Sequence, residues 1–362
     1  MDDKDIQNII DLMKIVRHET IDSQERKEFD LSEFNPMEFR LPEDFNTVRP
    51  IVSVDGSYCF LFSFLGAETW IALFRVAITN YEIKIINGEI KYHLRGPLKM
   101  VNRFFVLSFR EKVLNEQPRA FSLAKKDAEK FRTRKQQIFA TDIMTYLEHK
   151  TLEKISETYS DCILLADGAL VSRKDLYRKP IFDNIIDNCE KNDNWFAGVS
   201  KTTSSRFFDK FGFYSDDAFL KKFFDKKYPS LTYIKAPIQD FAAQFQQFHR
   251  HGDLYFAKMS ENALKWFRVD VGYDGGELEN LFSQIAAYSM VHMLPGYPIG
   301  LIEAHTGAKS VRKPKLKEMY EMRLIKPLKD IGLEPQEILD GAVDFDGEHW
   351  RSFHETLDLW SL

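Results

Sequence analysis

Two aspartates stand at the ends of strongly apolar segments of this 362-residue chain, and a glycine follows each. Asp55 follows the apolar segment 51–54, and Asp167 follows the unbroken apolar run 162–166. A carboxylate at the end of a buried strand loses hydration and needs a compensating charge or hydrogen bonds. An Asp-Gly pair also begins tight turns, so either pair alone is explained by a chain reversal. Two such pairs with a third carboxylate nearby favour a metal site.

Glu148 is the third carboxylate, and it lies in a segment, 135–158, whose apolar residues recur at helical spacing. Met144 precedes it by four residues and Leu152 follows it by four, so Glu148 lies on or beside the apolar stripe of the helix. A glutamate there is either a rim residue that reaches solvent or one that points inward at a partner.

We expect strand–helix–strand topology to bring Asp55, Glu148 and Asp167 to one edge of a sheet. Three carboxylates without thiolates suit hard divalent ions, so we expect Mn²⁺ or Mg²⁺, with two ions bound. The usual chemistry of such clusters is phosphoryl transfer, in which paired metals activate water and stabilise the departing oxygen. Asp142 and Glu153 share the helix and are weaker candidates for the same role.

Other constellations are poorer. The run 249–251 alternates two histidines with an arginine, and no apolar segment frames it, so we interpret it as a solvated turn. Ser57 lacks the GxSxG pattern of an esterase nucleophile. Segment 198–203 ends like a phosphate loop but lacks the leading glycine spacing, which argues against a Walker motif. Lys201, at the end of that strand, is either a surface lysine or a phosphate contact.

Cationic residues are concentrated in two runs, although the formal net charge is −5. Such runs are usually solvated helix faces, and the functional alternative is a surface that follows a phosphate backbone. The first run comprises Lys125, Lys126, Lys130, Arg132, Arg134 and Lys135, and the second Lys309, Arg312, Lys313, Lys315 and Lys317.

The order of expected elements predicts a mixed β-sheet covered by helices, an α/β fold. β-branched and aromatic residues from 51 onward indicate strands, and Asn87-Gly88 indicates a hairpin turn. Further strands are expected at 104–109, 162–166, 195–199 and within 253–271, and helices at 4–18, 135–158, 276–293 and 314–331. Residues 20–48 are predicted to form a linker or an extended arm.

Composition favours a cytoplasmic protein. Three cysteines, an odd number without CxxC spacing, fit a reducing compartment and exclude a cysteine-rich zinc site. The N-terminus is acidic where a signal peptide would be basic. The most apolar stretch, 60–74, is interrupted by polar residues, so we expect no membrane span.

Four segments, taken in order, resemble the NurA family of nucleases, the partners of HerA-type hexameric ATPases. They are Val54-Asp55-Gly56-Ser57, then Leu165-Ala166-Asp167-Gly168-Ala169-Leu170 after the helix with Glu148, then Gly198-Val199-Ser200-Lys201, and finally the segment from Gly296 to His305. Each is short, and their order and spacing over roughly residues 50–310 carry the resemblance.

The resemblance implies a ribonuclease-H-like core, a homodimer and manganese-dependent DNA cleavage, including 5′-to-3′ exonuclease activity, with single-strand endonuclease activity also open. By position in the motifs, Asp55, Glu148 and Asp167 are the implied metal ligands. Lys201 matches the family's lysine. Tyr297 and His305 match the tyrosine and histidine of the closing motif.

Two of these residues have open roles. The histidine at 305 either ligates metal or protonates the leaving oxygen, since its ordinary pKa near ~6.5 allows both. The tyrosine at 297 either stacks on a base or contacts a phosphate.

We expect an N-terminal helix and extended arm at 1–49, a nuclease domain at 50–333 with an insertion at about 204–247, and a tail at 334–362. Without a Walker loop, movement along DNA requires a separate ATPase. The 4–18 helix and the aromatic tail are candidate docking segments for it, although packing on the core is the favoured interpretation of both. One alternative is a non-catalytic dimeric DNA-end-binding subunit that regulates such a motor, whose DNA affinity would be indifferent to metal. Another is an RNA-directed nuclease of the same fold, separable by substrate competition.

Overall fold

The computed structural model describes Leu31 and Phe208 together with residues 34–64, 69–108, 136–173, 179–201, 215–236, 248–263, 265–291 and 294–331. The expected helix at 4–18, the cationic run at 125–135 and the tail at 334–362 lie outside these residues. In the described part, no helix is long and apolar enough to cross a membrane.

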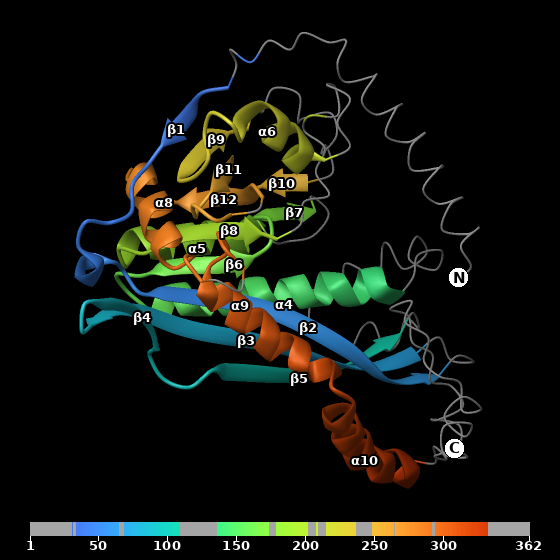
Figure 1. Ribbon diagram of the computed structural model, residues 1–362. Helices are drawn as coiled ribbons and strands as arrows, with labels where there is room; N and C mark the ends of the chain where they lie inside the picture. Colours follow the sequence, from blue (N-terminus) through green and yellow to red (C-terminus); the bar gives the residue numbers. More distant parts are fainter. Residues whose placement is uncertain are drawn as a thin grey trace, which may run out of the picture.

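A mixed sheet of ten strands runs through the molecule in the order β1-β9-β11-β12-β8-β6-β2-β3-β4, with β5 also paired to β3 (Figure 1). Among the described strands, the β2–β6 and β6–β8 pairs are parallel and the other pairs are antiparallel. The strands are β1 (Pro36–Glu38), β2 (Ile51–Phe64), β3 (Thr69–Ile86), β4 (Glu89–Leu94), β5 (Lys99–Ser108), β6 (Ile163–Asp167), β8 (Trp195–Ser200), β9 (Thr232–Lys235), β11 (Asp253–Lys258) and β12 (Phe267–Tyr273). Strands β7 (Val171–Arg173) and β10 (Phe248–Arg250) form a separate antiparallel pair.

Helices cover both faces of this sheet. On one face, α4 (Gln136–Thr158) and α5 (Lys179–Lys191) close an apolar cluster with β2, β3, β6 and β8. On the other, α8 (Leu278–Ala287) and α9 (Ile299–Lys309) close a second cluster, and α9 crosses β2 and β3 (Figure 1). The predicted class, a ribonuclease-H-like mixed sheet flanked by helices, is confirmed. The other helical segments are η1 (Phe45–Thr47), α6 (Asp216–Phe224), η4 (Ser310–Arg312) and α10 (Pro314–Asp330).

Side chains alternate between these two faces along the central strands. In β2, Ile51 packs into the α9 cluster and Val54 into the α4 cluster. Because side chains of a strand alternate with period two, Asp55 emerges on the α9 face. The same alternation places Asp167 on that face, since Leu165 belongs to the α9 cluster. Both aspartates therefore point away from α4.

The interpretation of Asp55-Gly56 as a strand end is wrong. Strand β2 continues unbroken to Phe64, because it stays paired with β3 after its parallel partner β6 has ended. Gly56 serves close packing here: a Cβ atom at this position would lie 2.2 Å from Cε of Met144 on α4. At the second pair the turn interpretation holds, since Gly168 adopts a φ of 125° just after β6.

The run 249–251 is not a solvated turn. His249 belongs to β10, which pairs with β7, and His251 is buried. The imidazole of His251 stacks on the Phe182 ring with centroids 3.9 Å apart, and His149 approaches the same ring edge-on at 4.4 Å. Pairing of β10 with a distant strand was not readable from three polar residues, because strand pairing depends on a partner elsewhere in the chain.

Candidate metal centre

Asp55 and Asp167 lie side by side at the point where the parallel ladder ends. Val54 pairs with Ala166 in that ladder, so the next residue of each strand is an aspartate, on the same face. Their side chains are only 8% and 13% exposed. The backbone N–H of Gly56 donates to Asp55 Oδ1 at 2.7 Å, and Oδ2 contacts the imidazole of His305.

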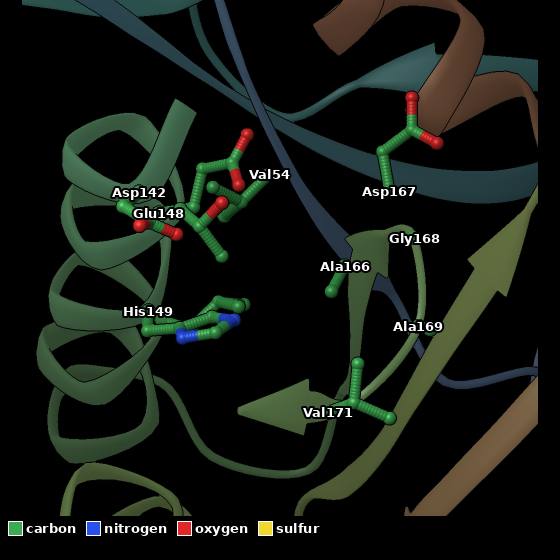
Figure 2. Close-up of a pocket in the computed structure, with 11 residues that line it drawn as sticks. Val54, Asp142, Glu148, His149, Ala166, Asp167, Gly168, Ala169 and Val171 are labelled. Carbon is green, nitrogen blue, oxygen red and sulfur yellow. The ribbon is translucent and has the colours of Figure 1, made fainter. Parts of the chain in front are cut away.

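Glu148 lies on the opposite side of β2 from these carboxylates. Its Oε1 is so close to Gly56 that a Cβ atom there would lie 2.7 Å from it. With Asp142 and His149 it lines a cavity of about 300 Å³ between α4 and β6, which Asp167 also lines (Figure 2). In that view the Asp167 carboxylate is directed away from α4. The cavity thus links the helix acids to Asp167 without bringing the three predicted acids to one point.

Glu153, the remaining acid of α4 considered from sequence, belongs to a different contact. Its Oε1 accepts a hydrogen bond from Asn184 Nδ2 on α5 at 2.7 Å, and its Oε2 pairs with Lys150. It ties the two helices together. Of the three acids of α4 considered from sequence, Glu148 and Asp142 line the cavity and Glu153 does not.

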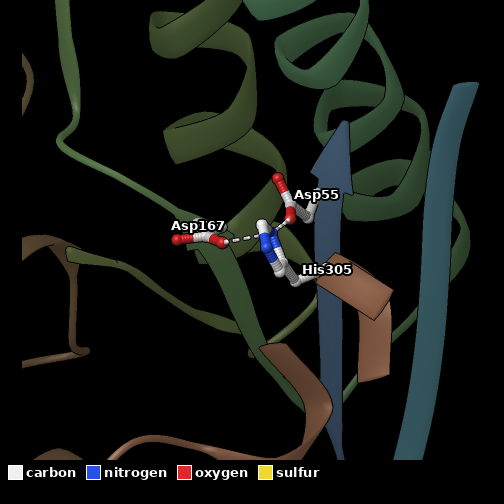
Figure 3. Close-up of side chains that lie close together, drawn as sticks. All are labelled: Asp55, Asp167 and His305. Carbon is white, nitrogen blue, oxygen red and sulfur yellow. Dashed lines mark hydrogen bonds and ion pairs between the residues drawn. The ribbon is translucent and has the colours of Figure 1, made fainter. Parts of the chain in front are cut away.

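His305 completes a three-residue group with the two aspartates. Its Nδ1 lies 2.6 Å from Asp55 Oδ2 and 3.7 Å from Asp167 Oδ2 (Figure 3). One ligand atom from each of the three residues lies within 4.8 Å of the other two. Two carboxylates and one imidazole are donors that suit Mn²⁺ and Mg²⁺, with the imidazole favouring Mn²⁺ of the two. The donor set therefore fits a divalent ion.

Two glycines of the closing motif bring His305 to this place. Gly296 has a φ of 87°, and a Cβ there would lie 2.9 Å from Phe267. At the second residue of α9, a Cβ at Gly300 would lie 2.4 Å from Ser53 Oγ, so only glycine allows the helix to lie directly on β2. Thr79 fixes the same contact by donating to the Gly300 carbonyl at 2.9 Å. His305 then sits over Asp55, about one and a half turns further along the helix.

Tyr297 is a buried support of the acidic group. Its hydroxyl donates to Asp167 Oδ1 at 2.7 Å, and its ring packs on Phe267 with centroids 5.5 Å apart. The side chain is fully buried. The ring is therefore not placed to stack on a base, and what the structure shows is a hydrogen bond that orients Asp167.

Lys201 contacts the other oxygen of the same carboxylate. Its Nζ lies 2.5 Å from Asp167 Oδ2 and 5.2 Å from the centre of the Tyr297 ring. Burial and the negative charge of Asp55 raise the pKa of Asp167. The charge of Lys201 and the hydrogen bonds that Lys201 and the Tyr297 hydroxyl each donate to Asp167 offset part of that rise. Burial, followed by the Asp167 charge, raises the pKa of Tyr297 well above its ordinary value, so its hydroxyl stays a donor.

Asp270 is a supporting residue that the sequence reasoning missed. It lies on β12, is completely buried, and accepts two hydrogen bonds from Arg268, each 2.8 Å long. Its Oδ2 also accepts the backbone N–H of Leu170 at 2.7 Å. The ion pair therefore fixes the loop that follows Asp167. The sequence signal that could have found it is the pair of charged residues, Arg268 and Asp270, within the otherwise apolar segment 267–271.

Cationic residues continue from α9 beyond the acidic group. The guanidinium of Arg312 donates to Ser57 Oγ at 3.2 Å, two residues along β2 from Asp55. Lys317, at the end of the same run, is buried and pairs with Glu321 at 3.7 Å, so it does not belong to the exposed surface. The exposed members are Lys309, Arg312, Lys313 and Lys315.

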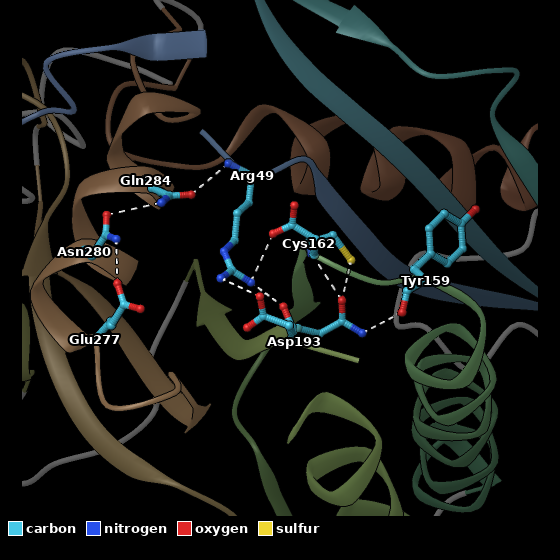
Figure 4. Close-up of polar contacts among 9 residues, drawn as sticks. Arg49, Tyr159, Cys162, Asp193, Glu277, Asn280 and Gln284 are labelled. Carbon is cyan, nitrogen blue, oxygen red and sulfur yellow. Dashed lines mark hydrogen bonds and ion pairs between the residues drawn. The ribbon is translucent and has the colours of Figure 1, made fainter. Parts of the chain in front are cut away.

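The opposite end of the parallel strands is closed by a polar network around Arg49 (Figure 4). Its guanidinium pairs with Asp161 at 3.3 Å and Asp193 at 3.1 Å and lies 4.3 Å from the centre of the Trp195 ring. Its backbone N–H donates to Gln284 Oε1 on α8 at 2.8 Å. This network joins the starts of three strands to a helix, whereas the carboxylates gather at the other end.

Comparison with known proteins shows the fold. No family model and no curated protein matches the chain. The NurA nuclease from Sulfolobus solfataricus superposes with a TM-score of 0.54 at 14% identity, over 92% of this chain and 100% of that one. An endonuclease V from Ciona intestinalis, at 11% identity over 88% and 100% of the two chains, gives a TM-score of 0.36. The first comparison confirms the fold that the sequence resemblance implies.

Proposed function

We propose that this protein is a divalent-metal-dependent deoxyribonuclease that hydrolyses phosphodiester bonds. The observation that carries the proposal is the group formed by Asp55, Asp167 and His305, whose ligand atoms lie within 4.8 Å of one another. The shared fold with a NurA nuclease supports it. Mn²⁺ or Mg²⁺ is the proposed cofactor, and two ions is the proposed number.

Asp55, Asp167 and His305 would hold one ion, and Glu148, across the adjoining cavity, would complete the site of a second or orient the attacking water. When bound, such ions activate water and stabilise the departing oxygen. The chain's own residues position these groups. Tyr297 holds one oxygen of Asp167, and Gly56 holds one oxygen of Asp55.

His305 has a second possible task. Its side chain is 43% exposed, so part of the ring reaches the solvent side of the site while Nδ1 faces Asp55. A protonated imidazole can deliver a proton to a leaving oxygen. A metal ligand must stay deprotonated, so the two roles exclude each other in a single step.

DNA is the proposed substrate, and the exposed cations of residues 309–315 are the proposed contacts for its backbone. Arg312 is held at Ser57, roughly 7 Å along β2 from Asp55 at ~3.3 Å per residue. A planar guanidinium suits bidentate contact with a phosphate. Lys201 is the proposed contact for a phosphate at the acidic group itself.

The finer properties rest on the resemblance to the NurA family. They are 5′-to-3′ exonuclease polarity with single-strand endonuclease activity, a homodimer, and action with a HerA-type hexameric ATPase in DNA end processing or defence inside the cytoplasm. The proposed nuclease domain is 50–333, with 204–247 as an insertion.

The test is cleavage of end-labelled single-stranded DNA, double-stranded DNA and RNA with Mn²⁺, Mg²⁺ or EDTA, with and without a candidate ATPase. Asp55→Ala should abolish metal-dependent DNA cleavage. The matched control is Glu89→Gln, which alters an exposed carboxylate of the β3–β4 hairpin, away from Asp55. Full activity in Asp55→Ala would overturn the assignment. DNA binding without cleavage under every condition would favour the non-catalytic end-binding subunit.

A further inference from the structure

One carboxylate oxygen at the candidate metal centre faces two different cation sites. Asp167 Oδ2 lies 3.7 Å from His305 Nδ1, on the side where the proposed ion binds. The same oxygen contacts Lys201 Nζ at 2.5 Å. The other oxygen, Oδ1, is occupied by the Tyr297 hydroxyl. A divalent ion that binds Asp167 beside His305 therefore has to share Oδ2 with an ammonium group or displace it.

The ammonium stabilises the two carboxylates in the absence of metal. Asp55 and Asp167 are nearly buried, and two neighbouring buried carboxylates repel each other unless a cation compensates them. Lys201 supplies that charge to Asp167, and its place over the Tyr297 ring adds a cation–π contact at 5.2 Å. A divalent ion supplies the same compensation more strongly, and its charge repels the ammonium.

A second lysine, Lys265, contacts the main chain of Lys201. Lys265 donates from Nζ to the main-chain carbonyl of Lys201 and lies 5.0 Å from the centre of the Phe267 ring. Burial lowers the pKa of Lys265; the charge of Asp217 opposes this, and the charges of Lys221 and Lys201 add to it. Lys265 thus adds a second positive charge at the main chain of Lys201, and two such charges attract an anion, which in a nuclease is a phosphate of the substrate.

We propose that Lys201 competes with the divalent ion for Asp167 and, once displaced, binds the substrate phosphate together with Lys265. Metal and phosphate then bind cooperatively, because each favours the arrangement in which Lys201 has left Asp167. Thermodynamic linkage requires that phosphate tighten metal binding by the same factor by which metal tightens phosphate binding. This inference rests on the proposed nuclease function and identifies how substrate and cofactor are coupled at its site.

The test is calorimetric titration with Mn²⁺ without any substrate. Lys201→Met removes the competing ammonium and keeps most of the side-chain volume, so it should bind Mn²⁺ about 5- to 150-fold more tightly than the wild type, the usual range of such couplings. Lys326→Met is the matched control. It removes one positive charge from an exposed position on α10, outside the cationic run at 309–315, and should bind Mn²⁺ nearly as the wild type does.

A second titration uses thymidine 5′-monophosphate, which carries a phosphate but has no phosphodiester bond to cleave. It should tighten Mn²⁺ binding to the wild type and to Lys326→Met, and this effect should be lost in Lys201→Met. Equal or weaker Mn²⁺ binding by Lys201→Met without nucleotide would overturn the competition, because it would mean that Lys201 only orients Asp167. Absence of Mn²⁺ binding to all three proteins would instead overturn the proposed function, and this inference with it.

Discussion

Gly300 on α9 lies against Ser53 on β2 so closely that a Cβ atom at position 300 would come within 2.4 Å of the serine Oγ. Both residues belong to elements that carry a proposed ligand, because Asp55 follows Ser53 by two residues and His305 follows Gly300 by five. The distance between the carboxylate and the imidazole thus depends on a helix–strand contact that only glycine permits.

Gly300→Ala should therefore separate His305 from Asp55. The added methyl group pushes α9 away from β2, which should lower the free energy of unfolding by about 1–3 kcal/mol, the usual effect of overpacking. It should also weaken Mn²⁺ binding. Thermal unfolding and calorimetry check the two effects. Thr306→Ala, at an exposed position on the same helix, is the control. Unchanged Mn²⁺ affinity in Gly300→Ala would mean that the packing of α9 on β2 does not set the geometry of the metal centre.

Tyr297→Phe should weaken Mn²⁺ binding without leaving a cavity in the protein core. The ring remains packed on Phe267, but Asp167 Oδ1 loses the hydroxyl that donates to it at 2.7 Å. Loss of a hydrogen bond behind a metal ligand typically lowers affinity or activity by about 10- to 100-fold. Mn²⁺ titration and DNA cleavage measure this loss.

Tyr288→Phe provides a control with the same chemical change. Tyr288 is also fully buried, and its hydroxyl donates to the Arg49 carbonyl at 3.0 Å at the opposite end of the strands. Both variants should lose roughly 1 kcal/mol of stability or somewhat more, since each leaves a buried acceptor without its donor. If both lowered Mn²⁺ affinity equally, the Tyr297 hydroxyl would have no specific role at the metal centre.

Asp167 should make the metal-free protein less stable as the pH rises. Burial and the Asp55 charge raise its pKa above the ordinary value of 3.8, so protonated Asp167 favours the folded state and its ionisation costs stability. That favourable contribution is present in full below the ordinary pKa and is lost as the pH rises through the folded pKa. Asp167→Asn lacks this titration.

The stability difference between Asp167→Asn and the wild type, measured in EDTA by urea unfolding, should move in favour of the variant as the pH rises from about 3.8, the ordinary aspartate value, to neutral pH. Adding Mn²⁺ should raise the unfolding temperature of the wild type, because the ion binds only the folded protein, and leave that of Asp167→Asn unchanged. A difference that stays flat across this pH range would contradict a raised pKa for Asp167.

The sheet was predictable because its signals are local. The apolar run before Asp167 became β6, and Asn87-Gly88 became the turn between β3 and β4 with the positive φ angles of 56° and 79° that such turns need. The continuation of β2 past Asp55 was not predictable. It depends on pairing with β3 over its whole length, whereas the sequence shows only an Asp-Gly pair that elsewhere ends a strand.

The geometry of the acids was predictable only in part, for a related reason. Helical periodicity placed Glu148 beside the apolar stripe of its helix, but it does not say on which face of β2 that helix packs. The structure puts α4 on the face opposite the two aspartates, and the third residue of their group, His305, comes from α9. His305 was found through a family resemblance, since the distance of 250 residues to Asp55 leaves no local signal.

Arg312→Ala should reduce DNA affinity in a salt-dependent way. The guanidinium is exposed and held at Ser57, next to the candidate metal centre, so it is placed to neutralise one phosphate. Each neutralised phosphate contributes about 0.7 for single strands or 0.9 for duplex DNA to the slope of log affinity against log salt concentration. The slope should therefore decrease by about that amount, measured by fluorescence anisotropy in EDTA so that no DNA is cleaved. Arg323→Ala, which removes an exposed arginine of α10, is the control for net charge. Equal slopes for Arg312→Ala and the wild type would place the DNA backbone on another surface, because a residue that neutralises a phosphate must change the number of ions released.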